Sequence, residues 1–113
     1  MLKIYHNPRC KKSREGLQYL QAKGVQFEII EYLKKPLTEK EIQELLMLLN
    51  KKPHEIIRTQ EEIYKNEYKN LQLTDNEWIK IISKNPILLQ RPIVAKKHKA
   101  VIGQPPQNID ILL

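Results

Sequence analysis

The sequence has little of what several protein classes require. Cys10 is the only cysteine among 113 residues, so no disulfide can form within the chain. The longest uninterrupted apolar segment is Leu45–Leu49, far shorter than the roughly 18 residues of a membrane-spanning helix. Aromatic residues make up only 6% of the chain, and no basic and aromatic platform for stacking nucleic-acid bases is visible. The start, Met1–Tyr5, does not resemble a signal peptide, and a lone cysteine is typical of reducing compartments. We therefore expect a cytoplasmic protein that neither spans a membrane nor binds nucleic acid.

Acidic residues are also few, with 13 Asp and Glu against 20 Lys and Arg, which gives a formal net charge of +7. The lysines are scattered rather than gathered in one tail, so a solvated lysine-rich surface explains most of this excess. A local site for an anion is the second interpretation. His54 and His98 lack the spacing of metal ligands, and we expect no metal site.

The chain contains no repeat, no low-complexity segment and no Gly/Ser linker. A length of 113 residues and an apolar fraction of 41% therefore predict a single domain over residues 1–113. A chain of this size buries roughly two thirds of the surface that its unfolded form exposes, enough for a core without a disulfide or metal. We expect a monomer.

The order of predicted elements indicates an α/β fold. Strands are expected at Leu2–Tyr5, Val25–Tyr32, Ile93–Ala95 and Ala100–Ile102. Helices are expected from Cys10 to Gly24, at the capping boxes Thr38–Glu41 and Thr74–Glu77, from Pro53 to Arg58, and after Pro106. The order is βαβ, then several helices, then ββα. This is the order of a thioredoxin-like fold with an inserted helical region.

Helical spacing selects the side chains expected in the core. The predicted inward positions are Leu17, Tyr19, Leu20, Ile42, Leu45, Leu46, Leu49, Trp78, Ile81, Ile82, Ile109, Ile111 and Leu112.

The segment after the first strand carries the strongest chemical signal. There a strand ends, a turn follows, and Cys10 opens a helix. The free backbone N–H groups and the dipole of a helix N-terminus favour a thiolate and can bind an oxyanion. Neighbouring cations, Arg9, Lys11, Lys12 and Arg14, add to this effect. A lone cysteine is often a small buried hydrophobe, but so polar a neighbourhood favours a reactive thiol.

Two further residues belong to this candidate site. Ser13 stands where a redox Cys-x-x-Cys pair has its second thiol, so an external thiol must resolve a modified Cys10. The Ser13 hydroxyl is a candidate hydrogen-bond donor to the sulfur. His6 is either a tuner of Cys10 or a hydrogen-bonded structural histidine, and the sequence favours neither interpretation.

The whole chain resembles the glutaredoxin-dependent arsenate reductases, a family related to the Spx-type regulators. The resemblance runs in order through YHNPRCKKSREGL, EYLKKPLT, IIRTQEEIYK, NPILLQRPIV and GQPPQNIDIL. It implies a thioredoxin-like fold, no bound cofactor, and Cys10 as the nucleophile that attacks the arsenic of arsenate. Glutathione, as co-substrate, then attacks the adduct and arsenite leaves. Glutaredoxin reduces the resulting Cys10–glutathione disulfide.

The resemblance also implies residues that bind the oxyanion. Arg58 and Arg91 match two family arginines, and a planar charged fork suits a tetrahedral oxyanion. Pro92 matches the cis-proline of thioredoxin-like folds, which implies that Arg91 lies close to the sulfur. Gln104 replaces the family's third arginine; it has no charge, and the hairpin lysines Lys97 and Lys99 are candidates to compensate.

Two alternatives to arsenate reduction remain at this point. One is a regulator that binds RNA polymerase, as Spx-type proteins do, although Cys-x-x-Ser lacks the second thiol of their redox switch. The other is a thiol or disulfide oxidoreductase of the same fold with a different substrate, for which Gln104 is the best argument.

Overall fold

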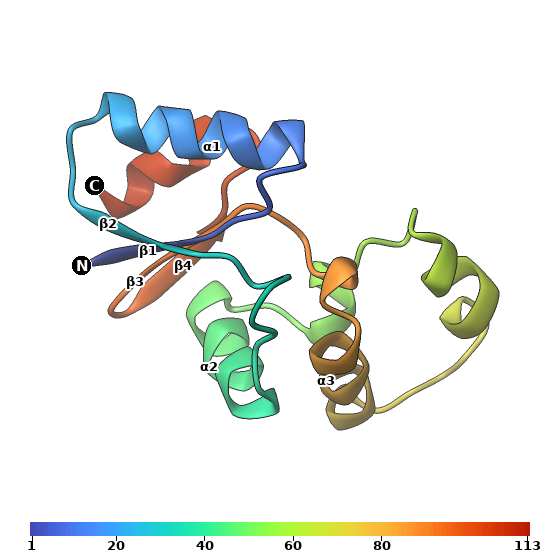
Figure 1. Ribbon diagram of the computed structural model, residues 1–113. Coiled ribbons are helices and arrows are strands. Elements are labelled where there is room, and N and C mark those ends of the chain that lie inside the picture. Colours follow the sequence, from blue (N-terminus) through green and yellow to red (C-terminus); the bar gives the residue numbers. More distant parts are fainter. The chain divides into compact units, whose positions relative to one another are not determined.

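The computed structural model describes residues 1–113, and the chain divides into two compact units (Figure 1). Residues Met1–Lys35 and Arg91–Leu113 form the first, called here the sheet unit. Residues Pro36–Gln90 form the second, called the helical unit. A single domain over residues 1–113 stays a prediction.

The sheet unit has a thioredoxin-like arrangement, which confirms the predicted fold class. Its four strands lie in the order β2-β1-β3-β4, with β1 parallel to β2 and antiparallel to β3, and β3 antiparallel to β4. Figure 1 shows the helix α1 and the 3₁₀ helix η4 over the sheet. The elements are β1 (Leu2–Tyr5), α1 (Lys11–Ala22), β2 (Phe27–Ile30), β3 (Ile93–Lys96), β4 (Lys99–Ile102) and η4 (Pro106–Leu112).

The core of the sheet unit lies between the sheet and these two helices. Alternation along β1 buries Leu2 and Ile4 on one face. Helical spacing adds Leu20 from α1 and Ile109 and Leu112 from η4, and Val94 of β3 completes the cluster. Ile111 is 62% exposed, so its predicted place in the core is wrong. It lies between the two residues of η4 that face the sheet.

The structure changes the predicted bounds of the second strand and confirms the predicted end of the first helix. The second strand is shorter than predicted, because β2 is the edge strand and only Phe27–Ile30 pair with β1. The first helix ends as predicted, with Gly24 at φ 69°, a conformation that favours glycine just past a helix C-terminus.

The helical unit confirms both predicted capping boxes. In each, the threonine hydroxyl accepts from the glutamate N–H and the glutamate accepts from the threonine N–H, for Thr38 with Glu41 and for Thr74 with Glu77. These boxes begin α2 (Glu39–Leu49) and α3 (Asp75–Lys84). The unit also contains η1 (Pro53–Ile56), the π-helical turn η2 (Tyr64–Tyr68) and η3 (Pro86–Leu88).

Two expectations in the helical unit are wrong. The helix opened by Pro53 is a single 3₁₀ turn that ends at Ile56, because the next residues pair in an extended conformation with residues 88–90. In α3 the buried residues are Trp78, Ile79 and Ile82, so Ile79 replaces the predicted Ile81. Periodicity allows either choice, and the neighbours of the helix select one.

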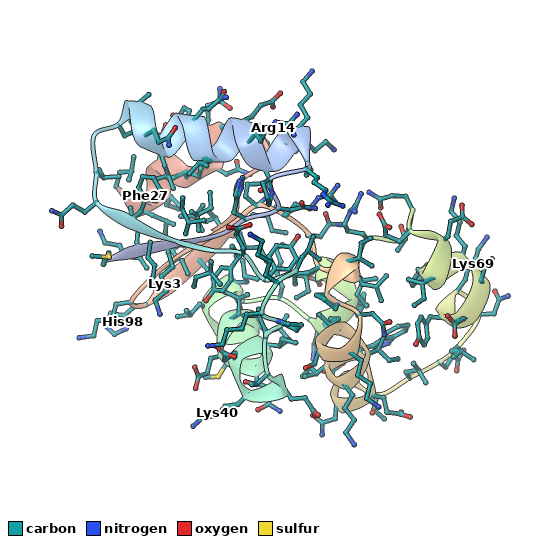
Figure 2. All side chains as sticks on the ribbon, viewed as in Figure 1. Lys3, Arg14, Phe27, Lys40, Lys69 and His98 are labelled. Carbon is teal, nitrogen blue, oxygen red and sulfur yellow. The ribbon has the colours of Figure 1, made fainter.

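Charged side chains extend outward from both units, as Arg14 on α1 and Lys40 on α2 illustrate (Figure 2). This supports a solvated lysine-rich surface as the main source of the positive charge. No helix combines the length and apolar character that crossing a membrane requires.

A close contact between α1 and the start of β3 gives a test of this packing. A Cβ atom added at Gly16 would lie 2.6 Å from Pro92 Cγ, within a buried part of the helix. An alanine in an exposed helix stabilises it by about 1 kcal/mol relative to glycine. We expect Gly16→Ala instead to lower the free energy of unfolding by about 1–3 kcal/mol, because Pro92 must move. Urea denaturation measures this change.

Gln18→Ala, on an exposed position of the same helix, is the control and should shift the free energy of unfolding by no more than about 0.5 kcal/mol. A Gly16→Ala protein as stable as wild type would show that α1 and Pro92 do not pack this closely.

Candidate active site

The loop between β1 and α1 is organised by Asn7. Its side-chain Oδ1 accepts from the Arg9 N–H at 3.0 Å, and its carbonyl accepts from the Cys10 N–H at 3.0 Å. The first bond forms an Asx turn, in which a side chain replaces a backbone acceptor, and the second closes a β-turn over the same residues. The turn delivers Cys10 to the N-cap position of α1, with φ −96° and ψ 124°. Sequence reasoning did not identify this role of Asn7, although an Asn-Pro pair after a strand is a turn signal.

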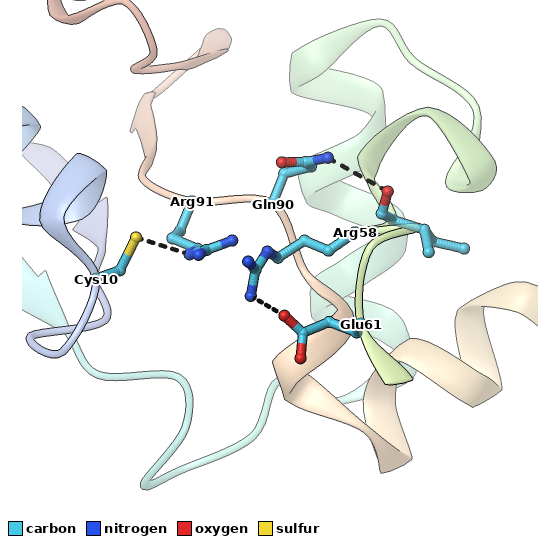
Figure 3. A network of polar contacts seen from close by, with 6 residues as sticks. Cys10, Arg58, Glu61, Gln90 and Arg91 are labelled. Carbon is cyan, nitrogen blue, oxygen red and sulfur yellow. Dashed lines mark hydrogen bonds and ion pairs between the residues drawn. The ribbon is translucent and has the colours of Figure 1, made fainter. Parts of the chain in front are cut away.

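Cys10 receives a hydrogen bond from an arginine far along the chain. Arg91 Nε donates to Cys10 Sγ at 3.0 Å (Figure 3). Cys10 is 9% exposed and Arg91 is half-buried. The structure therefore brings together two of the predicted site residues, a thiol and a permanently charged donor.

Strand register explains how these two residues meet. Tyr5 at the end of β1 pairs with Ile93 at the start of β3. Antiparallel strands run in opposite directions. The loop that follows Tyr5 and the residues that precede Ile93 therefore lie at the same ends of the two strands, next to each other. Arg91 therefore lies beside the loop that holds Cys10. The Arg91–Pro92 peptide bond is cis, as the family resemblance implied.

The neighbouring cations of the sequence do not hydrogen-bond to the sulfur, and their contribution to the charge around it stays a prediction. The four basic neighbours in the sequence are exposed, and none of them donates to the sulfur: Arg9, Lys11, Lys12 and Arg14. Arg14 Nη1 instead donates to the Pro8 carbonyl at 3.0 Å. The Cys10 side chain also accepts no capping hydrogen bond from the first turn of α1. The sulfur takes its hydrogen bond from Arg91 rather than from these local groups.

Ser13 is placed differently from the prediction. Its hydroxyl is fully buried, lies 2.7 Å from His6 Nδ1, and accepts from the Asn7 N–H at 3.0 Å. The expected hydrogen bond from Ser13 to the sulfur is therefore wrong, because the hydroxyl is already bonded to the loop. The Ser13 side chain ties the loop to the first turn of α1.

His6 is a buried histidine with 5% exposure, bonded to Ser13. Burial lowers the pKa of His6 below its ordinary value of 6.5, and the nearby Arg14 charge acts in the same direction. Glu31 and the bond with Ser13 oppose this change. The geometry corresponds to the structural interpretation of His6, a hydrogen-bonded group that supports the loop.

Gln104 is exposed and follows β4 in the sheet unit. Its carbonyl accepts from Asn108 Nδ2 at 3.2 Å, and the Gln104–Pro105 peptide bond is cis. The hairpin lysines Lys97 and Lys99 are exposed as well, and neither side chain forms a hydrogen bond or ion pair with another residue of the chain. Compensation for the missing third arginine by these lysines stays a prediction.

Arg58 lies in the helical unit, just after the bridge between Ile57 and Leu89. Its backbone N–H donates to the Leu88 carbonyl at 2.7 Å, and Gln90 Nε2 donates to the Ile57 carbonyl at 3.3 Å. These bonds anchor the base of the arginine side chain, and Figure 3 shows the one that Gln90 donates.

The Arg58 guanidinium has one charged partner. Arg58 Nη1 lies 2.5 Å from Glu61 Oε2, whereas Arg58 Nε is buried and has no hydrogen-bond partner among residues 1–113. Sequence reasoning missed Glu61. The only signal for it was an acidic residue three positions after the arginine.

A thiol at the start of α1, an arginine on its sulfur and a cis-proline before β3 define a cysteine-centred protein of the thioredoxin-like class. The chain belongs to the ArsC family, whose model matches residues 5–112. It is 42% identical over 108 residues to a protein named arsenate reductase from Haemophilus influenzae, covering 94% of this chain and 93% of that one.

Two further relatives extend this comparison. The solved structure of an arsenate reductase from Vibrio cholerae is 33% identical, with a TM-score of 0.94 over 99% of this chain and 97% of that one. The regulatory protein MgsR of Bacillus subtilis is 30% identical over 109 residues, covering 96% of this chain and 86% of that protein. The similarity therefore includes both proteins named as enzymes and one named as a regulator.

The buried His6 gives a prediction for acid stability. A histidine whose folded pKa lies below its unfolded value contributes stability that is complete above the unfolded pKa of 6.5 and is lost as the pH falls toward the folded pKa. We expect the free energy of unfolding to decrease as the pH falls from about 7 to 5.5, by at most about 1.4 kcal/mol per pH unit. His6→Asn should remove this slope. Urea denaturation across the range measures it.

His98→Asn, a change at an exposed histidine in the β3–β4 turn, is the control and should keep the wild-type slope. An unchanged slope in His6→Asn would show that His6 is not the group that couples folding to pH.

Proposed function

We propose that this protein is a thiol-dependent oxidoreductase that reduces arsenate to arsenite, with Cys10 as the nucleophile. The observation that carries the proposal is the 3.0 Å hydrogen bond from Arg91 Nε to Cys10 Sγ. A charged donor on the sulfur stabilises the thiolate, which is the nucleophilic form of cysteine. The remaining N–H groups of the same guanidinium suit an oxyanion that reaches the sulfur.

The proposed reaction begins when the Cys10 thiolate attacks the arsenic atom and an oxygen leaves as water. The product is a thiol–arsenate adduct, whose negative oxygens are stabilised by Arg91. A glutathione thiolate then attacks the Cys10 sulfur, and the sulfur–arsenic bond breaks with its electron pair on arsenic. Arsenite leaves, and Cys10 and glutathione form a mixed disulfide. The two thiols supply the two electrons that reduce the arsenic.

The resolving thiol must come from another molecule. Cys10 is the only cysteine, and Ser13 occupies the position where a second thiol of a redox pair would stand. We therefore assign glutathione as co-substrate and glutaredoxin as the partner that reduces the mixed disulfide. Both are expected in a reducing compartment such as the cytoplasm.

Three other residues have proposed roles. Arg58 is a second clamp for the oxyanion, supported by its buried Nε with no acceptor and by its match to a family arginine. His6 and Ser13 hold the loop that carries Cys10, because their mutual hydrogen bond is buried beneath it. They position the nucleophile and do not contact the sulfur.

The first test is arsenite formation from arsenate with glutathione, glutaredoxin and NADPH-coupled recycling. We expect turnover by wild type and none by Cys10→Ser, because a hydroxyl is a far weaker nucleophile than a thiolate at neutral pH. Omission of glutathione should also stop turnover. Circular dichroism of Cys10→Ser confirms that the variant is folded.

Iodoacetamide labelling gives a second measurement on the same samples, since Cys10 is the only cysteine and the label therefore reports on it alone. A wild-type protein that alkylates at neutral pH but forms no arsenite would exclude arsenate as the substrate while retaining a reactive thiol.

Arg91→Lys tests the arginine on the sulfur. Lysine keeps the charge but lacks the planar fork that donates to sulfur and oxyanion together. We expect kcat/KM for arsenate to fall by about tenfold to a hundredfold. Arg9→Lys, at an exposed position of the same loop, is the control and should leave kcat/KM unchanged. Equal losses in the two variants would remove Arg91 from the proposed mechanism.

A regulatory function is the second candidate, and the similarity to MgsR favours it. Such a protein would bind RNA polymerase and turn over no substrate. Co-purification with RNA polymerase from a cell extract, together with no arsenite formation, would support the regulator. Gln104 supports the remaining alternative, an oxidoreductase with a different thiol or disulfide substrate, because it places no charge where the family has an arginine.

A further inference from the structure

The turn after Arg58 brings a carboxylate onto a guanidinium that is largely shielded from water. Glu61 N donates to the Arg58 carbonyl at 3.2 Å, so the chain folds back over residues 58–61. The Arg58 side chain is 12% exposed and the Glu61 side chain is 20% exposed. Glu61 Oε2 lies 2.5 Å from Arg58 Nη1. A charge so far from water requires a partner of opposite charge. Glu61 is that partner.

The pairing leaves part of the guanidinium unused. Glu61 contacts Nη1, whereas the N–H on Nε points to another edge of the planar group and has no acceptor among residues 1–113. A buried donor without an acceptor is rare in folded proteins. Arg58 therefore holds a carboxylate on one nitrogen and a free donor on another.

We propose that Glu61 is a positioning residue that sets the oxyanion affinity of Arg58. The inference rests on the proposed function, because it takes Arg58 to be an oxyanion clamp. The Glu61 carboxylate holds the guanidinium by Nη1 and keeps Nε available. Its negative charge also offsets the positive charge that an arriving oxyanion meets.

The two effects of Glu61 act in opposite directions on affinity. Holding the guanidinium favours binding, since a fixed donor loses less conformational freedom when it binds. The carboxylate charge opposes binding, and the repulsion doubles for an oxyanion with two negative charges. In a partly buried site such repulsion is screened less than at the surface. The charge effect therefore dominates for arsenate and phosphate.

A glutamine at position 61 separates the two effects. Its side-chain oxygen still accepts a hydrogen bond from Nη1, but it has no negative charge. The guanidinium stays in place and the repulsion disappears. We expect the dissociation constants of inorganic phosphate and arsenate for the full chain, measured by isothermal titration calorimetry, to fall about tenfold in Glu61→Gln, which equals 1.4 kcal/mol. KM for arsenate should fall with them.

Glu62→Gln is the matched control, because it makes the same charge change one residue further along at an exposed position with no ion pair. We expect its dissociation constants to equal those of wild type. In an Arg58→Gln background, Glu61→Gln should have no effect on phosphate binding, since Glu61 acts through Arg58. A purely structural role of Glu61 would not produce this dependence.

An unchanged or larger dissociation constant in Glu61→Gln would overturn the proposal, as would an equal decrease in Glu62→Gln. Absence of phosphate and arsenate binding in every variant would overturn it too. Circular dichroism shows whether Glu61→Gln is folded. If it is not, Glu61→Asn is the second neutral variant, and its dissociation constants should also fall.

The arsenite assay separates this inference from the proposed function. Tighter phosphate binding in Glu61→Gln with no arsenite formed by wild type would support the role of Glu61 and reject arsenate reduction. Arsenite formation by wild type with unchanged dissociation constants in Glu61→Gln would support the reductase and reject the role of Glu61.

Discussion

The hydrogen bond from Arg91 Nε to Cys10 Sγ joins two residues that are 81 positions apart in the chain. It depends on the antiparallel pairing of β1 with β3, because the register of Tyr5 with Ile93 sets the residue before Pro92 against the loop after β1. Sulfur is a weak acceptor as a thiol and a strong one as a thiolate. One strand pairing thus determines which charged group bonds to Cys10.

The loop that carries Cys10 is held by buried hydrogen bonds of Ser13 as well as by the contact with Arg91. Ser13 and His6 are bonded to each other in the interior, and the same serine oxygen accepts from the Asn7 N–H. Gly16, one turn further along α1, leaves room for Pro92. These contacts hold the loop that carries Cys10, and Arg14 adds a hydrogen bond from Nη1 to the Pro8 carbonyl. A rigid loop keeps the geometry of a site close to that required for reaction.

The helical unit contains the opposite arrangement, an ion pair made by residues three positions apart. Arg58 and Glu61 meet through a tight turn, and the pairing of Arg58 with Leu88 fixes the point from which the arginine side chain extends. A buried arginine with its own counter-ion can be stable without a ligand. Its unpaired Nε is the feature that distinguishes it from an ordinary structural ion pair.

Much of the local structure was determined by the sequence itself. The two capping boxes, the end of α1 at Gly24 and the order of strands and helices were predictable, because each depends on residues within about four positions or on a simple periodicity. Cys10 and Arg91 were predictable as site residues, from a polar loop at a helix start and from family resemblance.

The tertiary structure decided which partners the side chains choose. Arg91, not its sequence neighbours, reaches the sulfur, and Ser13 binds His6 instead of Cys10. It also decided that Ile79 rather than Ile81 is buried, and that Arg58 has an unused donor. These outcomes depend on strand register and on packing between distant segments, and no pattern within a short stretch of sequence contains that information.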